Sequence, residues 1–591
     1  MIKYDVLVSI LDEIRNKAES DLDFFLPERG KTTLENARSR ALIHFFLKSR
    51  FGILDFKARE ELITEGTYDG GIDAYFINTE DKIIYLIQCK FRASSGGYAK
   101  KEIDNKDLWK MDLERITTGE TKDVAGNSYD KKILNFQKAL RGLKNKSEFK
   151  FVTVIAANLN ELQKKYILTT YFPKKWEIHV FNYERVYDDL LFPYVRDDFF
   201  TENKLTFQIP LSSVDKKPIN YEVKTEYGTC TIFMLFVPTE EIAKALIRYK
   251  NSILKYNPRT YLGMQSKGVN KKIEDSILNK DTNDFVLLNN GITMLSTESS
   301  YTEHTGKKKT GEITVKDPQI INGGQTSFAL AHIYERFLRK ELSKNPFKGK
   351  EVLLRVIVQG DTEKYNKITG PVSQATNNQS EIKKGDLLSN HVFQVDLQKY
   401  LYDEFNLLYE RKKGEFFNSL ANSYVKKEDV VNRNDFIRAA YASGFPKKIK
   451  NPKNLSEPNL FSNEIFKILS QKTNYKKYAL SYLVYREVQK LKVQARKPAN
   501  KWFTAKCGFA LRYGDLAVTI IATHSFAGAA WTKKDIPQKV KDTLDKWKKF
   551  ESQVFAKKSN VLYFNPKTKE SNPIGYYKSD NLITDLIEYF T

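Results

Sequence analysis

Cysteine is scarce in this chain, and its placement excludes two kinds of stabilising site. The chain has 591 residues but only three cysteines, Cys89, Cys230 and Cys507, which lie far apart and form no CxxC pair. This spacing predicts neither a zinc site nor a disulfide framework. It fits a reducing cytosol, so we expect a cytoplasmic protein.

Long hydrophobic runs are also missing. The N-terminal stretch MIKYDVLVSILDEI carries acids inside its apolar pattern, which predicts an amphipathic helix rather than a signal peptide. The most apolar late stretch, GDLAVTIIATHSFAGAAW, is interrupted by Asp515 and His524 and is too short for a membrane span. We expect a buried helix there, and no membrane partner.

Several catalytic signatures are absent as well. The sequence contains no GxxxxGK[ST] phosphate loop of the kind that marks many NTPases, and no Ser-His-Asp pattern. No internal repeat or low-complexity linker is visible. The following histidines show no metal-ligand spacing to one another: His179, His304, His332, His391 and His524.

Positive charge is abundant. The net charge is +24, and the excess is mostly lysine dispersed along the chain. A lysine-rich composition can simply keep a protein soluble, or it can attract polyanions through counterion release. Composition alone leaves both interpretations open.

The pattern of elements predicts an α/β (α+β) protein of three parts. Residues 1–204 mix helices and strands: a helix beginning after Thr33, a polar loop ASSGGYAKKEIDNKD, and strands at 149–158 and 176–186. Residues 205–430 alternate strands with helices, and residues 431–591 are mainly helical.

The stretch GGIDAYFINTEDKIIYLIQCKFR predicts a β-hairpin that ends in polar residues. With strands at Ile72–Ile77 and Lys82–Phe91, Asp73 lies beside Ile87 or Gln88, depending on the register. In either register Asp73, Gln88 and Lys90 lie at one end of the hairpin, where glycines permit a tight turn.

Such a cluster suits metal-assisted hydrolysis of a phosphodiester. A carboxylate such as Asp73 holds a hard divalent cation, Mg²⁺ or Mn²⁺, which activates a water. Lys90 can orient that water or stabilise the transition state, while Gln88 offers a weaker, neutral ligand. The bland alternative is a hairpin that ends at the surface, with Lys90 and Arg92 merely solvated.

Asp73 followed by Gln88-Cys89-Lys90 resembles the PD-(D/E)XK nuclease superfamily over about residues 30–190. The resemblance implies a restriction-endonuclease-like mixed sheet flanked by helices. It also implies a glutamate ligand from the first core helix, for which Glu35 is the best match and Glu65 and Asp69 are alternatives. Gln88 stands where the family usually has an acid, which puts the metal stoichiometry in doubt.

Four phrases of the second part form a different pattern: NPRTYLG, LLNNGITML, DPQIINGGQTSFALAH and ATNNQSEIKKGDLLSN. With LLYERKKGEF they resemble, over about residues 220–420, the AIPR family, proteins linked with abortive-infection phage resistance in bacteria. The resemblance implies a role in antiviral defence and no established reaction.

The phrase DPQIINGGQTSFALAH also predicts a strand, a Gly-Gly turn and a helix. Backbone amides at such a turn can bind an anion, although a tight turn needs no ligand. The candidate residues for a ligand or nucleic-acid pocket are Arg259, Asn289, Asn290, Asn322, Gly323, Gly324, Gln325, Thr326, Asn377 and Asn378.

The sequence therefore predicts a Mg²⁺- or Mn²⁺-dependent endonuclease acting in defence against phage, with duplex DNA as the expected substrate and RNA as the alternative. Asp73, Gln88 and Glu35 would hold the metal, and Lys90 would act on the phosphate or the water. A homodimer is expected from the need to cut two strands. Two rival hypotheses are a nucleic-acid-binding protein that does not cleave, and a nucleotide or phage-component sensor whose nuclease is gated.

Overall fold

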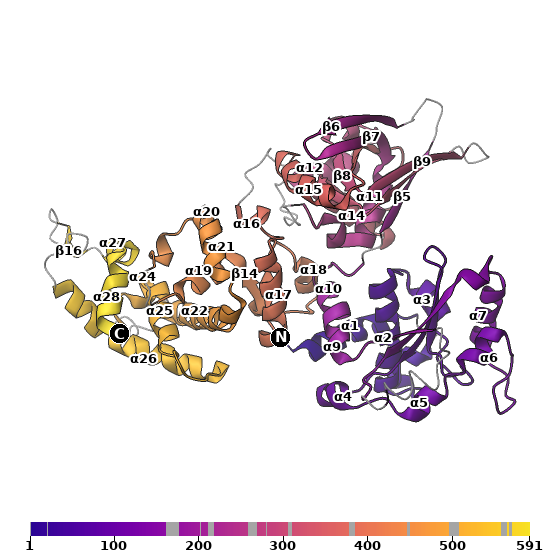
Figure 1. Ribbon diagram of the computed structural model, residues 1–591, viewed down its shortest axis with the longest axis horizontal. Helices are drawn as coiled ribbons and strands as arrows, with labels where there is room; N and C mark the ends of the chain where they lie inside the picture. Colours follow the sequence, from indigo (N-terminus) through magenta and orange to yellow (C-terminus); the bar gives the residue numbers. More distant parts are fainter. Residues whose placement is uncertain are drawn as a thin grey trace. The chain divides into compact units, whose positions relative to one another are not determined.

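The computed structural model of the chain divides into two compact units (Figure 1). The first comprises Met1–Thr369 and Glu415–Lys426, and the second comprises Gly370–Gly414 and Lys427–Thr591. The structure describes residues 2–19, 22–160, 163, 176–200, 203–210, 218–257, 269–278, 281–304, 310–376, 384–445, 449–495, 507–556, 564–565, 570–571 and 573–591.

The N-terminal part is built on a four-stranded mixed sheet with the order β1-β2-β3-β4. Strand β1 is antiparallel to β2, whereas β2, β3 and β4 are parallel, so their carboxyl ends lie at one edge. The elements are α1 (Lys3–Asn16), α2 (Leu34–Phe51), α3 (Phe56–Leu62), β1 (Ala74–Asn78), β2 (Ile83–Cys89), α4 (Ser95–Lys100), α5 (Asn105–Trp109), α6 (Leu113–Thr118), α7 (Lys131–Arg141), β3 (Lys150–Ala156), β4 (Glu177–Val180), α9 (Tyr183–Arg185) and α10 (Phe192–Val195).

Helices cover both faces of this sheet. Helix α2 begins where predicted, because the Thr33 side chain accepts a hydrogen bond from the Asn36 N–H at 3.2 Å. Its last residue, Phe51, stacks on Phe76 of β1 with ring centroids 4.4 Å apart. Neighbouring side chains of a strand point to opposite faces, so Tyr75 faces away from Phe76. Its ring packs on Phe136 of α7, with ring centroids 4.5 Å apart. The predicted mixed sheet between helices is confirmed.

Two local predictions were wrong in this part. The segment ASSGGYAKKEIDNKD contains the short helices α4 and α5 instead of an irregular loop. Ser94 and Asp104 cap the two helices by accepting hydrogen bonds from backbone N–H groups. The glycines and charged residues of the segment obscured these capping signals. The strand predicted at 176–186 is shorter, because Asn182 caps a helical turn directly after β4.

The middle part contains two further sheets around one hydrophobic core. One has the order β5-β10-β9 and the other β11-β8-β12-β7-β6, in which only β8 and β12 are parallel. The elements are β5 (Lys204–Pro210), β6 (Ile219–Thr225), β7 (Gly228–Pro238), α11 (Thr239–Tyr249), α12 (Val269–Leu278), α13 (Phe285–Leu288), β8 (Ile292–Ser296), β9 (Glu298–His304), β10 (Thr310–Lys316), β11 (Gln319–Asn322), α14 (Gly324–Leu338), β12 (Glu351–Val358), α15 (Thr362–Thr376) and α18 (Phe417–Ala421).

The second unit is mainly helical, as predicted. The apolar stretch near 520 forms the buried helix α25. Among the described residues, no helix combines the length and the apolar character needed to cross a bilayer. The elements are α16 (Lys384–Leu387), α17 (Val392–Phe405), β13 (Leu408–Glu410), β14 (Val430–Asn432), α19 (Arg433–Ala442), α20 (Glu457–Leu460), α21 (Asn463–Leu469), α22 (Tyr475–Ala495), α24 (Ala510–Tyr513), α25 (Asp515–His524), α26 (Ile536–Ala556), β15 (Phe564–Asn565), β16 (Glu570–Ser571), α27 (Pro573–Lys578) and α28 (Asn581–Phe590).

The α/β class and the helical C-terminal part are thus confirmed. That the chain has three folding units, with boundaries near 205 and 430, stays a prediction.

A buried group of charges joins α2 to α3. His44 is fully buried, its Nδ1 accepts a hydrogen bond from the Arg59 guanidinium at 3.1 Å, and its Nε2 lies 3.0 Å from Glu60. An arginine can only donate, so the neutral ring must carry its proton on Nε2. Burial lowers the pKa of His44 from 6.5 to about 4, although the bond to Glu60 opposes the shift.

This pKa makes the N-terminal part sensitive to acid. The unfolded chain binds a proton that folded His44 does not, so the unfolding free energy is expected to fall as the pH drops from 6.5 toward 4. The expected loss is roughly 2–3 kcal/mol. His44→Gln can keep both hydrogen bonds but cannot titrate, so urea unfolding should show a smaller loss for this variant between pH 7 and 4.5.

Candidate active site

The polar residues of the β1–β2 hairpin lie at one end, as predicted. Ala74 is in register with Ile87, and the Asp73 backbone N–H donates to the Ile87 carbonyl at 2.8 Å. The Asp73 carboxylate accepts a hydrogen bond from the Cys89 N–H at 2.6 Å. Continuing this register sets Asp73 opposite Gln88, and its carboxylate is bound by the backbone N–H that lies between Gln88 and Lys90 in the sequence.

Glycines are required at the entrance to this end. Gly70 and Gly71 have φ angles of 60° and 72°, in the left-handed region. A Cβ on Gly71 would lie 2.6 Å from the carbonyl carbon of Lys110. Asp69 holds the same turn, because its carboxylate accepts hydrogen bonds from the N–H groups of Gly66 and Gly71. These bonds give Asp69 a structural task.

Gln88 is buried in an unusual state. Its side chain is only 5% exposed, yet its Oε1 meets no hydrogen-bond donor among the residues that the structure describes. Buried polar atoms in folded proteins nearly always have a partner, because an unpaired one keeps the full cost of desolvation. An amide oxygen left in this way is available to a ligand.

The carboxylates around Asp73 disfavour each other's charge. Burial raises the pKa of Asp73 well above its usual value, and the charge of Glu65 raises it further. The Cys89 N–H and the Lys90 ammonium oppose this shift. Burial also raises the pKa of Glu65, against the effect of Arg40. A divalent cation would offset the charge that both groups carry when ionised.

Glu65 and Glu35 are both candidates for a third ligand, and the charge of Glu65 is seen to act on Asp73. Glu65 lies on the segment after α3, where Arg40 donates to its carboxylate at 3.3 Å. Glu35 lies in the first turn of α2, where its charge acts to raise the pKa of Tyr4. The structure therefore favours Glu65, and a ligand role for Glu35 stays a prediction.

Lys90 follows the last residue of β2. Its backbone N–H continues the ladder to β3 by donating to the Ala156 carbonyl at 3.0 Å. Its ammonium pairs with Asp107 of α5 at 2.9 Å, and 35% of the side chain is exposed. This is a cation within reach of solvent, paired with a partially exposed acid that an anionic ligand could replace.

The donor set fits a hard cation. Asp73 and Glu65 supply carboxylate oxygens and Gln88 supplies a buried amide oxygen that lacks a partner, all of them the oxygen ligands that Mg²⁺ and Mn²⁺ take. No group of three His, Cys, Asp or Glu side chains suited to a metal occurs in the described part of the chain. A set of two acids and one amide is consistent with that finding.

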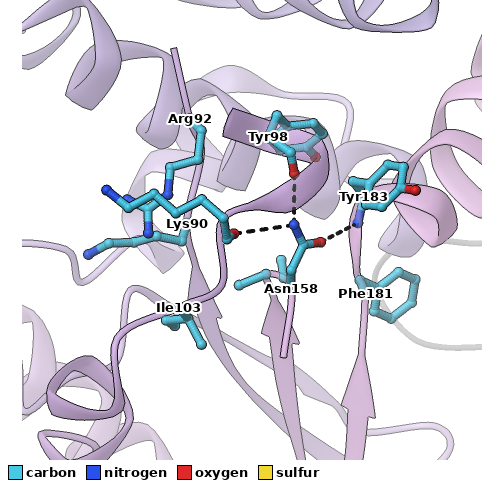
Figure 2. A pocket seen from close by; sticks show the side chains of 10 residues that line it. Lys90, Arg92, Tyr98, Ile103, Asn158, Phe181 and Tyr183 are labelled. Atoms are coloured by element: carbon cyan, nitrogen blue, oxygen red, sulfur yellow. Dashed lines mark hydrogen bonds between the residues drawn. The ribbon is translucent and has the colours of Figure 1, made fainter. Parts of the chain in front are cut away.

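A pocket that the sequence did not predict adjoins Lys90 (Figure 2). It lies beyond the carboxyl ends of β2, β3 and β4, and Arg92, Lys101, Asn158 and Tyr183 are among the residues that line it. The parallel strands could have indicated it, because ligands of open α/β sheets bind outside the carboxyl ends of the strands. The pairing of these strands, however, cannot be seen from local patterns.

The predicted Gly-Gly turn of the middle part is confirmed between β11 and α14. Gly323 has a φ of 86°, and a Cβ there would lie 2.9 Å from the Ile292 side chain and 3.0 Å from the Gly291 carbonyl. Asn289 donates to the Thr326 hydroxyl at 3.0 Å and accepts from the Gly291 N–H at 3.0 Å. These contacts explain the glycine and the asparagine by packing alone.

The other candidates of this second site are only partly placed. Gly324 begins α14 next to the buried Asn257, while Asn290 precedes Gly291 and Asn322 ends β11. Gln325 follows in the first turn of α14. Arg259, Asn377 and Asn378 lie outside the described residues. A ligand pocket at this turn stays a prediction.

Comparison with known proteins gives one match. A family model described as AIPR protein matches residues 254–559, just over half of the chain. No curated protein and no solved structure matches the chain. The matched segment reaches well past residue 420, into the helical part, and it does not include the β1–β2 hairpin.

Proposed function

The chain belongs to the AIPR family, which is associated with abortive infection and phage defence, and from that premise we propose that it is a metal-dependent nuclease of such a defence. Its N-terminal part would hydrolyse phosphodiester bonds of nucleic acid, with duplex DNA as the substrate. The observation that carries the proposal is the unpartnered, buried Gln88 oxygen beside Asp73 and Lys90. The mixed sheet flanked by helices supports the resemblance to PD-(D/E)XK nucleases.

Asp73, Glu65 and Gln88 would hold a Mg²⁺ or Mn²⁺ ion. When bound, this cation supplies an activated water and offsets charge on the phosphate. Asp73 must give up the proton that its raised pKa favours, and the Cys89 N–H fixes the orientation of its carboxylate. Lys90 would leave Asp107 and donate to a phosphate oxygen, stabilising the charge that develops during attack by water.

The test is cleavage of supercoiled plasmid by the full chain with Mg²⁺ or Mn²⁺ and with EDTA. Wild-type protein is expected to nick or linearise the plasmid only with a metal. Gln88→Leu removes the unpaired oxygen and keeps a side chain of similar size. It should raise the metal concentration needed for half-maximal cleavage by about tenfold. Gln88→Glu restores an acid and should cleave at a lower metal concentration than the wild type.

The pair of Gln88 variants also controls for contamination. A contaminating nuclease would cleave equally in all three preparations, which would contradict the proposal. Absence of cleavage by the wild type with either metal, and on RNA as well as DNA, would also contradict it. In the proposal, cutting both strands of a duplex requires a homodimer, which light scattering of the protein on DNA would detect.

A nucleic-acid-binding protein that does not cleave is the second candidate. The observation that favours it is the donor set itself, in which a neutral amide accompanies two carboxylates. This candidate predicts tight, salt-sensitive binding that metal does not convert into cleavage.

A further inference from the structure

Beyond Lys90, the edge of the N-terminal sheet carries a basic pocket that the proposed chemistry does not use. Register pairs Cys89 with Ala156 and Ile155 with Val180, so β2, β3 and β4 end side by side. The pocket lies at these ends, and Lys90, Ala156 and Phe181 are among the residues that line it (Figure 2). An opening at the carboxyl ends of parallel strands is where open α/β sheets bind ligands.

Charge in the pocket has one sign. Lys90, Arg92 and Lys101 line it, and none of its lining residues is acidic. Lys90 and Arg92 are two residues apart in the segment that follows β2, and they extend toward the same side of the pocket in Figure 2. Arg92 donates to the Glu102 carbonyl at 3.2 Å, which uses one of its five N–H groups. Such a cluster of cations is suited to a phosphate.

The frame of the pocket is held by one asparagine. Asn158 follows β3 and donates from its side chain to the carbonyls of Tyr98 at 2.8 Å and Lys101 at 3.3 Å. Its side-chain oxygen accepts from the Tyr183 N–H at 2.9 Å (Figure 2). Asn158 therefore joins the segment carrying Lys101 to the ends of β3 and β4. A site held in this way is formed before a ligand arrives.

We propose that this pocket binds a backbone phosphate of the nucleic-acid strand, next to the phosphate that is cut. This inference rests on the proposed nuclease function. Lys90 stands at the border of the two sites, because it lies two residues after Gln88, just past the end of β2, and also lines the pocket. Arg92 and Lys101 belong to the pocket alone, and they would position the strand without reading its sequence.

Binding without cleavage tests the pocket separately from the chemistry. The full chain is titrated into labelled duplex DNA in EDTA, and the anisotropy is followed over a range of salt concentrations. The double variant Arg92→Gln, Lys101→Ala should bind about tenfold more weakly and lower the salt slope by about 1, because one phosphate contact is lost. The matched control is Lys100→Ala, Lys106→Ala, which removes two exposed lysines outside the pocket and should leave the slope of the salt dependence closer to that of wild type.

A modified substrate locates the contact. Cleavage of duplexes with a single uncharged methylphosphonate is measured with wild type and with the double variant. At one position beside the cut, the methylphosphonate should slow cleavage by the wild type. It should not slow cleavage by the double variant further, because that variant already lacks the contact. Unchanged affinity and salt slope in the double variant, or full additivity at every position, would overturn the proposal.

Two further outcomes separate the alternatives. If the double variant binds weakly but no preparation ever cleaves, the nuclease proposal fails and the phosphate pocket stands. If inorganic phosphate at low concentration abolishes the difference between wild type and double variant, the pocket serves a free phosphate, and the strand assignment is wrong.

Discussion

Asp73→Asn is expected to abolish metal-dependent cleavage and, at the same time, to stabilise the metal-free protein at neutral pH. The rate should fall on the order of 10³-fold or more, because the variant would lose the main charged ligand of the proposed site. Asparagine keeps an oxygen that can accept the Cys89 N–H, so the hairpin should remain folded.

The gain in stability follows from the raised pKa of Asp73. Folded protein binds a proton on this buried carboxyl that the unfolded chain has already released, so its unfolding free energy falls as the pH rises above 3.8. The neutral amide escapes that loss. In EDTA the variant should therefore unfold at a higher temperature than wild type at pH 7, and the difference should shrink as the pH is lowered.

Added metal should reverse the order of stability. In the proposal Mn²⁺ binds folded wild type, so it is expected to raise the unfolding temperature of the wild type and to have little effect on the variant. Asp81→Asn is the matched control, because Asp81 lies at the opposite end of the same hairpin and accepts a hydrogen bond from Asn78. If the two variants behave alike in cleavage and in metal-induced stabilisation, Asp73 is not a metal ligand.

Much of the hairpin could be predicted from local signals. Alternation and the length of the turn placed Asp73, Gln88 and Lys90 at one end, and the structure confirms this arrangement. The Thr33 cap and the apolar spacing after it likewise predicted α2. Local hydrogen bonds and side-chain periodicity determine these features, so a window of sequence contains the information.

Other features of the site depend on tertiary packing. Gln88 was predicted as a weak ligand, but its lack of a hydrogen-bond partner depends on what surrounds it in the fold. The basic pocket requires β2, β3 and β4 to end together, although about sixty residues separate the first two strands in the chain. Arg92 and Lys101 thus carried no signal that a single segment could display.

The third metal ligand, which the nuclease resemblance takes from a helix, also depends on tertiary packing. A resemblance to a nuclease family favoured Glu35 because that residue lies on the first core helix after the N-terminus. In the structure the charge of Glu65 raises the pKa of Asp73, as does that of Asp69, which already holds the glycine turn. Arg40 of α2 joins Glu65 to Glu60 by contacting both carboxylates, so the helix contributes a partner of the acid.

Glu65→Gln is therefore expected to lower the cleavage rate by about 10²-fold, while Glu35→Gln should remain within a few-fold of wild type. Glutamine keeps an oxygen that can accept the Arg40 bond, which limits damage to the fold. Because the variant loses a charged ligand, higher Mn²⁺ concentrations should restore part of its rate, an effect that a purely structural defect would not show. The measurement is the initial rate of plasmid nicking as a function of Mn²⁺ for both variants. If Glu35→Gln strongly lowers the cleavage rate and Glu65→Gln cleaves normally, Glu35 of α2 is the third ligand and Glu65 is not.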